Sequence, residues 1–207
     1  MAYRRTEKIQ SRLDETREQI VRAGRKFVAR NGFAKASMAE IAREAGVATG
    51  TLYKHFTSKD ELICEIYRLN GLYEMGRIEA ISQQTELAAS TRIETAIRSF
   101  LSRAMQSRPM AYASLEEPAG AALEIERIKM RELHTTIYQR MIEDGIAAGE
   151  FSEQDPFVSA SGIAGAVTAS MIGPLNFSRT LTTTDIDHII DGLVSFCLNA
   201  VSARSPL

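Results

Sequence analysis

The sequence has few of the residues that stabilise small secreted proteins or span membranes. Only two cysteines occur among 207 residues, Cys64 and Cys197, and both stand in largely apolar, helix-like contexts. Two isolated cysteines do not form a disulfide framework, so we expect buried free thiols, with redox sensing as the alternative. The longest apolar run, residues 162–175, is interrupted by Thr168 and Ser170 and is too short to span a bilayer. The charged N-terminus lacks the apolar core of a signal peptide, and we therefore expect a cytoplasmic protein.

Catalytic and metal-binding patterns are also missing from the sequence. The three histidines and two cysteines are scattered without metal-ligand spacing, and no nucleophile-base arrangement or phosphate loop stands out. Glu116 and Glu117 are adjacent, which on a helix turns their side chains about 100° apart rather than toward one substrate. We therefore predict no catalytic residue, no metal and no cofactor, and we do not expect an enzyme.

Charge is distributed unevenly along an otherwise ordinary soluble composition. The chain is 44% hydrophobic and 25% charged, with a formal net charge of -1. Residues 1–60 contain 13 Lys and Arg against 7 Asp and Glu, whereas the remainder contains 12 against 19. A basic N-terminal third joined to an acidic remainder is expected when one part meets phosphates and the rest does not. A solvated basic face is the alternative.

The first strong local signal is the stretch SMAEIAREAG, which begins at Ser37. Ser37 with Glu40 three residues later forms a capping box, which predicts that a helix begins at Met38. Gly46 is expected to end this helix, because glycine enters the left-handed region at little cost. The apolar face of the helix would comprise Met38, Ile41, Ala42 and Ala45.

A second short helix and the start of a third follow at once. Leu52 and Phe56 lie four residues apart and would both face inward, while small, hydrogen-bonding and cationic residues are left to face outward. Ser58 and Glu61 form another capping box, so a third helix should begin at Lys59. Residues 37–56 therefore indicate a helix-turn-helix whose short second helix suits the major groove, with a generic helical hairpin as the alternative. The predicted DNA-binding residues are Ser37, Met38, Thr49, Gly50, Thr51, Tyr53, Lys54, His55 and Lys59.

These residues carry a resemblance. The run from Thr16 to Tyr67 is similar to the DNA-binding domain of the TetR/AcrR family of transcriptional regulators, through Ile20, Ala23, Phe27, Gly32, Phe33, Ile41, Ala42, Ala45, Gly46, Val47, Gly50, Thr51, Leu52, Tyr53, His55, Phe56, Ser58, Lys59 and Leu62. The later two thirds resemble the family only in helix pattern and in the segment GIAAGEF, residues 145–151. The resemblance implies an all-helical, dimeric, ligand-responsive repressor.

The rest of the chain reads as helices without any strand pattern. We expect a helix from Asp14 to Asn31, preceded by a basic arm that is either solvated or laid along DNA. Further helices are expected at 59–81, 91–108, 110–117, 121–148, 156–173 and from about Thr184. The prediction is an all-α fold of about nine helices. Residues 1–58 would form the DNA-binding domain, and residues 59–207 a helical domain for ligand binding and dimerisation.

The last two predicted helices differ from the others in residue composition. Small residues recur along one stripe of the helix at 156–173, and the final helix has a strongly apolar face. One recognition unit reads few base pairs, so such proteins typically pair two units. We therefore predict a two-fold homodimer on palindromic half-sites, although packing within one chain is the alternative for any single helix. The predicted interface comprises Gly162, Gly165, Ala166, Ala169, Ile189, Leu193, Phe196 and Ala200.

The middle of the chain supplies methionine and aromatic residues that could line a pocket for an apolar molecule. Taken singly each could equally be core, but the resemblance implies a ligand cavity. The predicted ligand contacts are Phe100, Met105, Tyr112, Met130, His134, Tyr138, Met171, Asn176 and Phe177. The overall prediction is a DNA-binding repressor that a small apolar or amphipathic ligand releases from its operator. The alternatives are a helical architectural DNA-binding protein without a ligand and, less favoured, an enzyme that uses the helical cavity.

Overall fold

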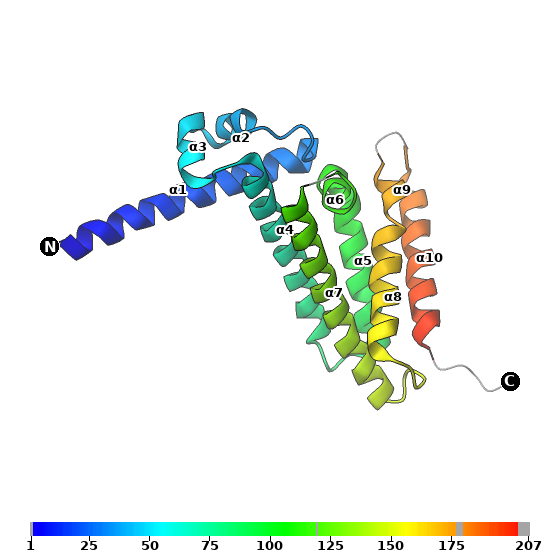
Figure 1. Ribbon diagram of the computed structural model, residues 1–207. Helices are drawn as coiled ribbons and strands as arrows, with labels where there is room; N and C mark the ends of the chain where they lie inside the picture. The colour runs from blue at the N-terminus through cyan, green and yellow to red at the C-terminus, as the bar shows by residue number, and fades with distance from the viewer. Residues whose placement is uncertain (1, 119, 177–179, 203–207) are drawn as a thin grey trace.

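The computed structural model describes residues 2–118, 120–176 and 180–202, with side chains from residue 9 onward. Within these residues all regular secondary structure is helical (Figure 1). The helices are α1 (Ala2–Asn31), α2 (Met38–Ala45), α3 (Thr49–His55), α4 (Lys59–Ser82), α5 (Ala89–Gln106), α6 (Arg108–Leu115), α7 (Ala121–Ala147), α8 (Pro156–Ala169), α9 (Ile172–Leu175) and α10 (Thr183–Val201). Since α9 is a single turn, the predicted all-α fold of about nine helices is confirmed.

The first three helices and the beginning of α4 enclose a small core, which we call the head (residues 20–67). Its fully buried side chains include Ile20, Val28, Ile41, Leu52, Phe56, Leu62 and Ile66. Met110 and Ala113 of α6 and Leu123 of α7 belong to the same cluster. The head therefore rests on α6 and α7 through continuous apolar packing.

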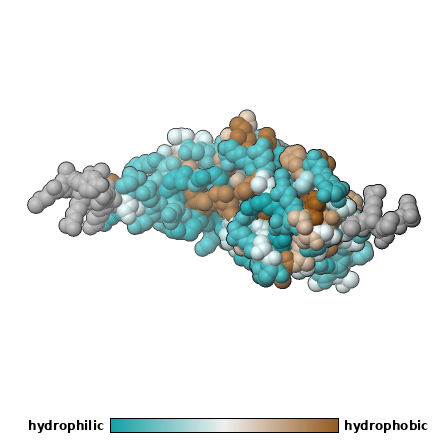
Figure 2. Space-filling model, turned by 90° about the horizontal axis from the view of Figure 1, so that it is seen from below, coloured by the Kyte–Doolittle hydropathy of each residue, from teal (hydrophilic) through white to brown (hydrophobic). Residues whose placement is uncertain are grey.

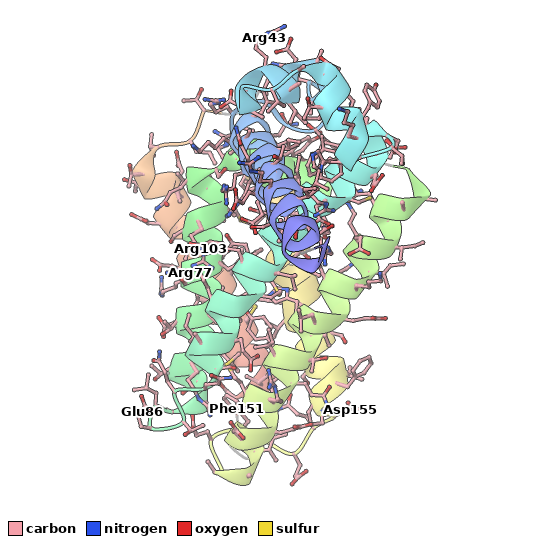
Figure 3. The ribbon with its side chains drawn as sticks, turned by 90° about the vertical axis from the view of Figure 1, so that its left-hand side faces the viewer. Arg43, Arg77, Glu86, Arg103, Phe151 and Asp155 are labelled. Atoms are coloured by element: carbon pink, nitrogen blue, oxygen red, sulfur yellow. The ribbon has the colours of Figure 1, made fainter. Side chains whose placement is uncertain are left out.

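The remaining helices form a bundle below the head. In Figure 1, α4, α5, α7, α8 and α10 run alongside one another, and α4 descends from the head into the bundle. The second core is built from the later part of α4 and from these helices, with fully buried Ile78, Ile93, Leu101, Tyr138 and Val167 among its members. In Figure 3, Arg43 lies at the outer end of the head and Phe151 and Asp155 lie at the opposite end of the bundle.

Helix α1 is longer than the sequence predicted. We expected Asp14 to cap it, but the helix continues back to Ala2 and projects beyond the head (Figure 1). Asp14 instead accepts a hydrogen bond from Gln10, and Glu15 accepts one from Ser11, both at the four-residue spacing that supports a helix. A residue that can cap a helix does not do so when the residues before it favour helix as well.

The C-terminal helices also begin and end differently from the prediction. The stretch predicted as one helix over 156–173 is broken after Ala169, and a separate turn begins at Ile172. The last helix is capped by Thr182 with Asp185 in a complete capping box, two residues before the predicted Thr184. Both positions offer a hydroxyl followed three residues later by a carboxylate, so local spacing alone did not distinguish them.

The junction before α8 is held by contacts distant in sequence. Glu150 accepts hydrogen bonds from the backbone N–H groups of Ala89 and Ser90 and from the Ser90 hydroxyl, so it caps α5. These bonds lower the pKa of the Glu150 carboxyl against the opposing effect of burial. Gly145 lies so close to Phe151 that a Cβ there would come within 2.2 Å of the ring.

One stretch of the described chain, Pro156–Leu175, has the length and composition of a membrane span, with a third of its most apolar window buried in the protein. Ala160, Ile163, Ala164 and Val167 of this stretch are buried in the chain itself. Viewed from the far end of the bundle, the visible surface is largely hydrophilic with separate hydrophobic clusters (Figure 2). A single such stretch is weak support for membrane insertion, because core helices have the same composition.

Candidate DNA-binding surface and effector cavity

Helices α2 and α3 form the predicted helix-turn-helix. The Ser37 hydroxyl accepts a hydrogen bond of 3.1 Å from the Glu40 backbone N–H, and Gly46 ends α2 in the left-handed region at φ 68°. The Glu40 carboxylate accepts from Arg43 instead of completing the box. At the start of α4, Ser58 likewise accepts from the Glu61 N–H, while Glu61 accepts from Thr57. Each half-box is sufficient to place its helix.

Helix α3 separates its buried and exposed residues as predicted. Leu52, and Phe56 directly after the helix, are fully buried, whereas Tyr53 is 54% exposed. Ser37, Thr49, Gly50, Lys54 and Lys59 are exposed, and Thr51 and His55 are half-buried. Nothing approaches a Cβ position built on Gly50 within 4 Å, so this face is open.

Within the predicted DNA-binding set, Lys54 and Lys59 differ from Met38 in their surroundings. Among the described residues, no ion pair involves Lys54 or Lys59, which leaves both ammonium groups available for phosphates. Met38 is only 7% exposed and packs in the core of the head. The Met38 side chain is therefore held in the core, and a contact of Met38 with DNA, which stays a prediction, would have to come from its backbone.

A cavity of about 400 Å³ lies where α4, α5, α6, α7, α8 and α9 meet. A second cavity of about 280 Å³ shares part of its wall, including Asn70, Glu74 and Phe100. The first is bounded by Tyr67, Asn70, Gly71, Glu74, Met75, Phe100, Ser114, Leu115, Glu116, Glu124, Arg127, Met130, Arg131, His134, Gly165, Thr168, Ala169 and Ile172. Its volume and mixed lining are typical of a small-molecule site.

The structure brings together only part of the predicted ligand set. Phe100, Met130 and His134 line the larger cavity, and Phe100 and Met171 line the smaller one. Tyr138 is fully buried beside the His134 ring. Met105, Tyr112 and Asn176 line neither cavity, and Phe177 lies outside the described residues.

Sequence reasoning missed the contribution of α4 to the cavity. Tyr67, Asn70, Glu74 and Met75 all lie on this helix and line the larger cavity. Tyr67, Asn70 and Glu74 are spaced three and four residues apart, which places them on one side of a helix and was a usable signal. Helix α4 thus packs in the head with its first part and forms a wall of the cavity with its later part.

A buried arginine connects the cavity to the head. Arg127 is 8% exposed and donates from Nε to the Ser114 carbonyl at 3.0 Å and from Nη2 to the Ala113 and Glu117 carbonyls at 2.9 and 2.7 Å. The Glu117 carboxylate in turn accepts from the Ala34 backbone N–H at 2.9 Å. We call this arrangement the corner (residues 113–117 with Arg127). It joins the cavity wall directly to the turn after α1.

The predicted dimer residues all remain accessible in the single chain. Gly162, Gly165, Ala169, Phe196 and Ala200 are exposed, and Ala166, Ile189 and Leu193 are half-buried. Phe157, Val158 and Phe196 are 59%, 63% and 61% exposed. A Cβ added at Gly162 or Gly165 meets nothing within 4 Å, so no helix of the same described chain approaches this stripe.

Comparison with known proteins agrees with this arrangement. The model of the bacterial regulatory proteins of the tetR family matches residues 20–66, which is the head. The chain is 26% identical over 141 residues to the fatty acid metabolism regulator protein of Bacillus subtilis, covering 65% of this chain and 70% of that protein. It is 27% identical over 184 residues to the transcriptional repressor KstR of Mycobacterium tuberculosis, covering 86% and 78%.

Solved structures extend the likeness to the whole fold. The transcriptional regulator FadR from Bacillus subtilis, in complex with stearoyl-CoA, superimposes with a TM-score of 0.73 at 19% identity over 89% of this chain and 98% of that one. At this identity the match concerns the fold. The family model therefore confirms the resemblance over residues 20–66, which match the DNA-binding region of the bacterial regulatory proteins of the tetR family, and the solved structures show the same fold over most of the chain.

Proposed function

We propose that the protein is a cytoplasmic homodimeric repressor that binds a two-fold symmetric DNA operator and is released from it by a small apolar or amphipathic ligand. It acts by binding and not as an enzyme. The observation that carries the proposal is that α4 belongs to both functional parts. Leu62, Ile66 and Tyr67 pack in the core of the head, Tyr67 also lines the cavity, and Asn70 and Glu74 line it about one and two turns after Ile66.

The DNA half of the proposal rests on the exposed face of α3. Thr49, Gly50 and Thr51 are small enough at the start of a short helix to let the backbone approach base edges. The DNA phosphates would be bound by Ser37, Tyr53, Lys54, His55 and Lys59. The excess of basic residues within residues 1–60 supplies the favourable potential.

Ligand control would reach the head by two routes. Along α4, Arg25 of α1 donates to Asn70 at 3.2 Å, and Glu74 pairs with Arg103 of α5 at 2.7 Å (Arg103 is labelled in Figure 3). Through the corner, Arg127 and Glu117 join the cavity to Ala34. A ligand that shifts either route would tilt the head and change the separation of two heads. Half-sites lie about 34 Å apart, so a few ångströms of change would prevent both heads from binding together.

Dimerisation through α8 and α10 would supply the second head. The stripe of small residues on α8 permits close helix approach, and the exposed Phe157 and Phe196 give apolar area to bury. For the ligand, the acyl-CoA found in the Bacillus subtilis FadR structure makes stearoyl-CoA a reasonable first compound to screen.

The test is a fluorescence-anisotropy titration against DNA from upstream of the gene, at physiological salt with excess unrelated DNA. We expect tight binding, a two-fold symmetric footprint and one dimer per site. If this DNA fails, selection from random DNA supplies the operator. Absence of any preferred sequence after selection would contradict the proposal, and specific binding that no cavity ligand weakens would favour an architectural protein.

A further inference from the structure

Two side chains in the wall of the larger cavity have a buried polar atom without a hydrogen-bond partner among the described residues, Ser114 at Oγ and His134 at Nε2, and His134 is the more deeply buried of the two. His134 is 3% exposed, and its Nε2 atom has no hydrogen-bond partner among the described residues. The ring is held between two aromatic side chains, with centroids 5.5 Å from Phe100 and 4.9 Å from Tyr138. Buried polar atoms in native proteins are normally paired, so an unpaired one in a cavity wall points to a missing ligand group.

Arg131, the nearest charged cavity residue in sequence, stands three residues before His134 on α7, and it does not contribute to the pKa of the imidazole. Glu124, Arg127 and Arg131 precede His134 on α7, and the helical rise places Arg127 roughly 10 Å away along the axis. Glu74 on α4 is engaged by Arg103. Burial alone lowers the pKa of His134 to about 4, with no contribution from a charged neighbour. His134 is therefore uncharged at neutral pH.

Apolar side chains from four helices share the cavity wall with His134. Met75, Phe100, Met130 and Ile172 line the same cavity, from α4, α5, α7 and α9. An ion placed against these apolar side chains and the uncharged imidazole would lose hydration that they do not replace, which is unfavourable. An uncharged group loses much less and can bond to the imidazole, which has one donor and one acceptor nitrogen when neutral.

We propose that the effector carries an uncharged hydrogen-bonding group, such as a hydroxyl, an amide or an ester carbonyl, which bonds to Nε2 of His134. Its apolar body lies against Met75, Phe100 and Met130. This inference rests on the proposed function in taking the cavity as the effector site. It excludes simple carboxylates that would enter with the charged end toward His134.

The experiment is calorimetric titration of the full-length protein with three probes of equal chain length, 1-decanol, decanoate and decylamine, at neutral pH. We expect decanol to bind at least tenfold more tightly than either ion. His134→Leu should weaken decanol binding about tenfold, because one hydrogen bond is lost, and leave decanoate unchanged. His134→Gln keeps a hydrogen-bonding group and should restore most of the decanol affinity.

Tyr138→Phe is the matched control. This substitution removes a buried hydroxyl that, like His134 Nε2, lacks a partner among the described residues. Because Tyr138 does not line the cavity, decanol affinity should stay within twofold. His134→Leu should not lower the melting temperature, because it removes an unpaired buried group. Equal binding of decanol and decanoate, no decanol binding, or unchanged decanol affinity in His134→Leu would each overturn the inference. These titrations contain no DNA, so failure of operator binding would be seen separately.

Discussion

Apolar side chains alone fill the centre of the head, whereas the bundle buries polar groups among its apolar ones. Ile41, Leu52 and Phe56 are fully buried in the head, and its polar residues face outward. The bundle encloses Arg92, Arg127 and His134, each less than 9% exposed. A fully packed core suits a rigid surface that reads DNA, and a core with cavities and buried polar groups suits one that binds a ligand and responds to it.

The difference in packing between the head and the bundle is tested most directly by removing one large aromatic side chain from each. Phe56→Ala should cost about 3–5 kcal/mol and abolish DNA binding, because it empties a packed core. Phe100→Ala should cost less than about 2 kcal/mol, because Phe100 is half-buried and already borders two cavities. Denaturant unfolding of both variants measures the difference. Equal losses would show that the bundle is packed as tightly as the head.

The buried imidazole makes the stability of the bundle depend on pH between pH 6.5 and pH 4. The folded-state pKa of His134, about 4, lies below its ordinary value of 6.5, so the unfolded chain binds the proton first as the pH falls. His134 therefore contributes about 3 kcal/mol to the free energy of unfolding above pH 6.5, and this contribution is lost progressively as the pH falls to 4. Between pH 7 and pH 4, the free energy of unfolding of His134→Leu should fall by about 3 kcal/mol less than that of wild type. Parallel losses would mean that His134 is hydrated in the folded protein.

The turns of the two regions should respond alike. Gly46 in the head and Gly149 in the bundle have φ of 68° and 74°, and a Cβ at either position meets nothing within 4 Å. Replacement of either by Ala should therefore cost only the backbone term, about 1 kcal/mol. Melting temperatures of Gly46→Ala and Gly149→Ala provide the measurement. A much larger loss at Gly46 would indicate that the turn of the helix-turn-helix tolerates no relaxation.

The smallest expected effect on stability belongs to the DNA-facing surface. Lys54 is exposed and forms no ion pair within the described chain, so Lys54→Ala should leave the melting temperature unchanged. It should weaken binding to all DNA sequences similarly and reduce the slope of log affinity against log salt by about 1. Lys129→Ala, on the bundle surface, is the control and should change neither the DNA affinity nor the salt slope. A loss at one base position alone would assign Lys54 to base reading.

The same contrast explains what could be predicted from sequence. The helix-turn-helix is set by neighbours in the chain, since Ser37, Gly46 and Ser58 act on residues three or four positions away, and each was identified correctly. Local signals failed where two of them competed, as at Thr182 and Thr184, or where a cap came from far away, as Glu150 does for α5.

The cavity wall depends on contacts between distant helices. Composition pointed to Phe100, Met130 and His134, which line the larger cavity, because methionine and aromatic residues are typical of such sites. It could not identify Asn70 or Glu74, which look like surface residues of a connecting helix until α5 and α7 pack against them. Nor could it exclude Met105 or Tyr112, whose distance from the cavity depends on the packing of α5 and α6.

The central claim is that the state of the cavity controls the head. The direct measurement is the operator affinity of Phe100→Trp, which places a larger ring in the cavity without any ligand, beside that of wild type. Circular dichroism should show an intact fold, and lost decanol binding should show that the larger ring blocks the ligand site. We predict at least a tenfold loss of operator affinity. Unchanged operator affinity with the ligand site blocked would contradict the coupling through α4 and the corner.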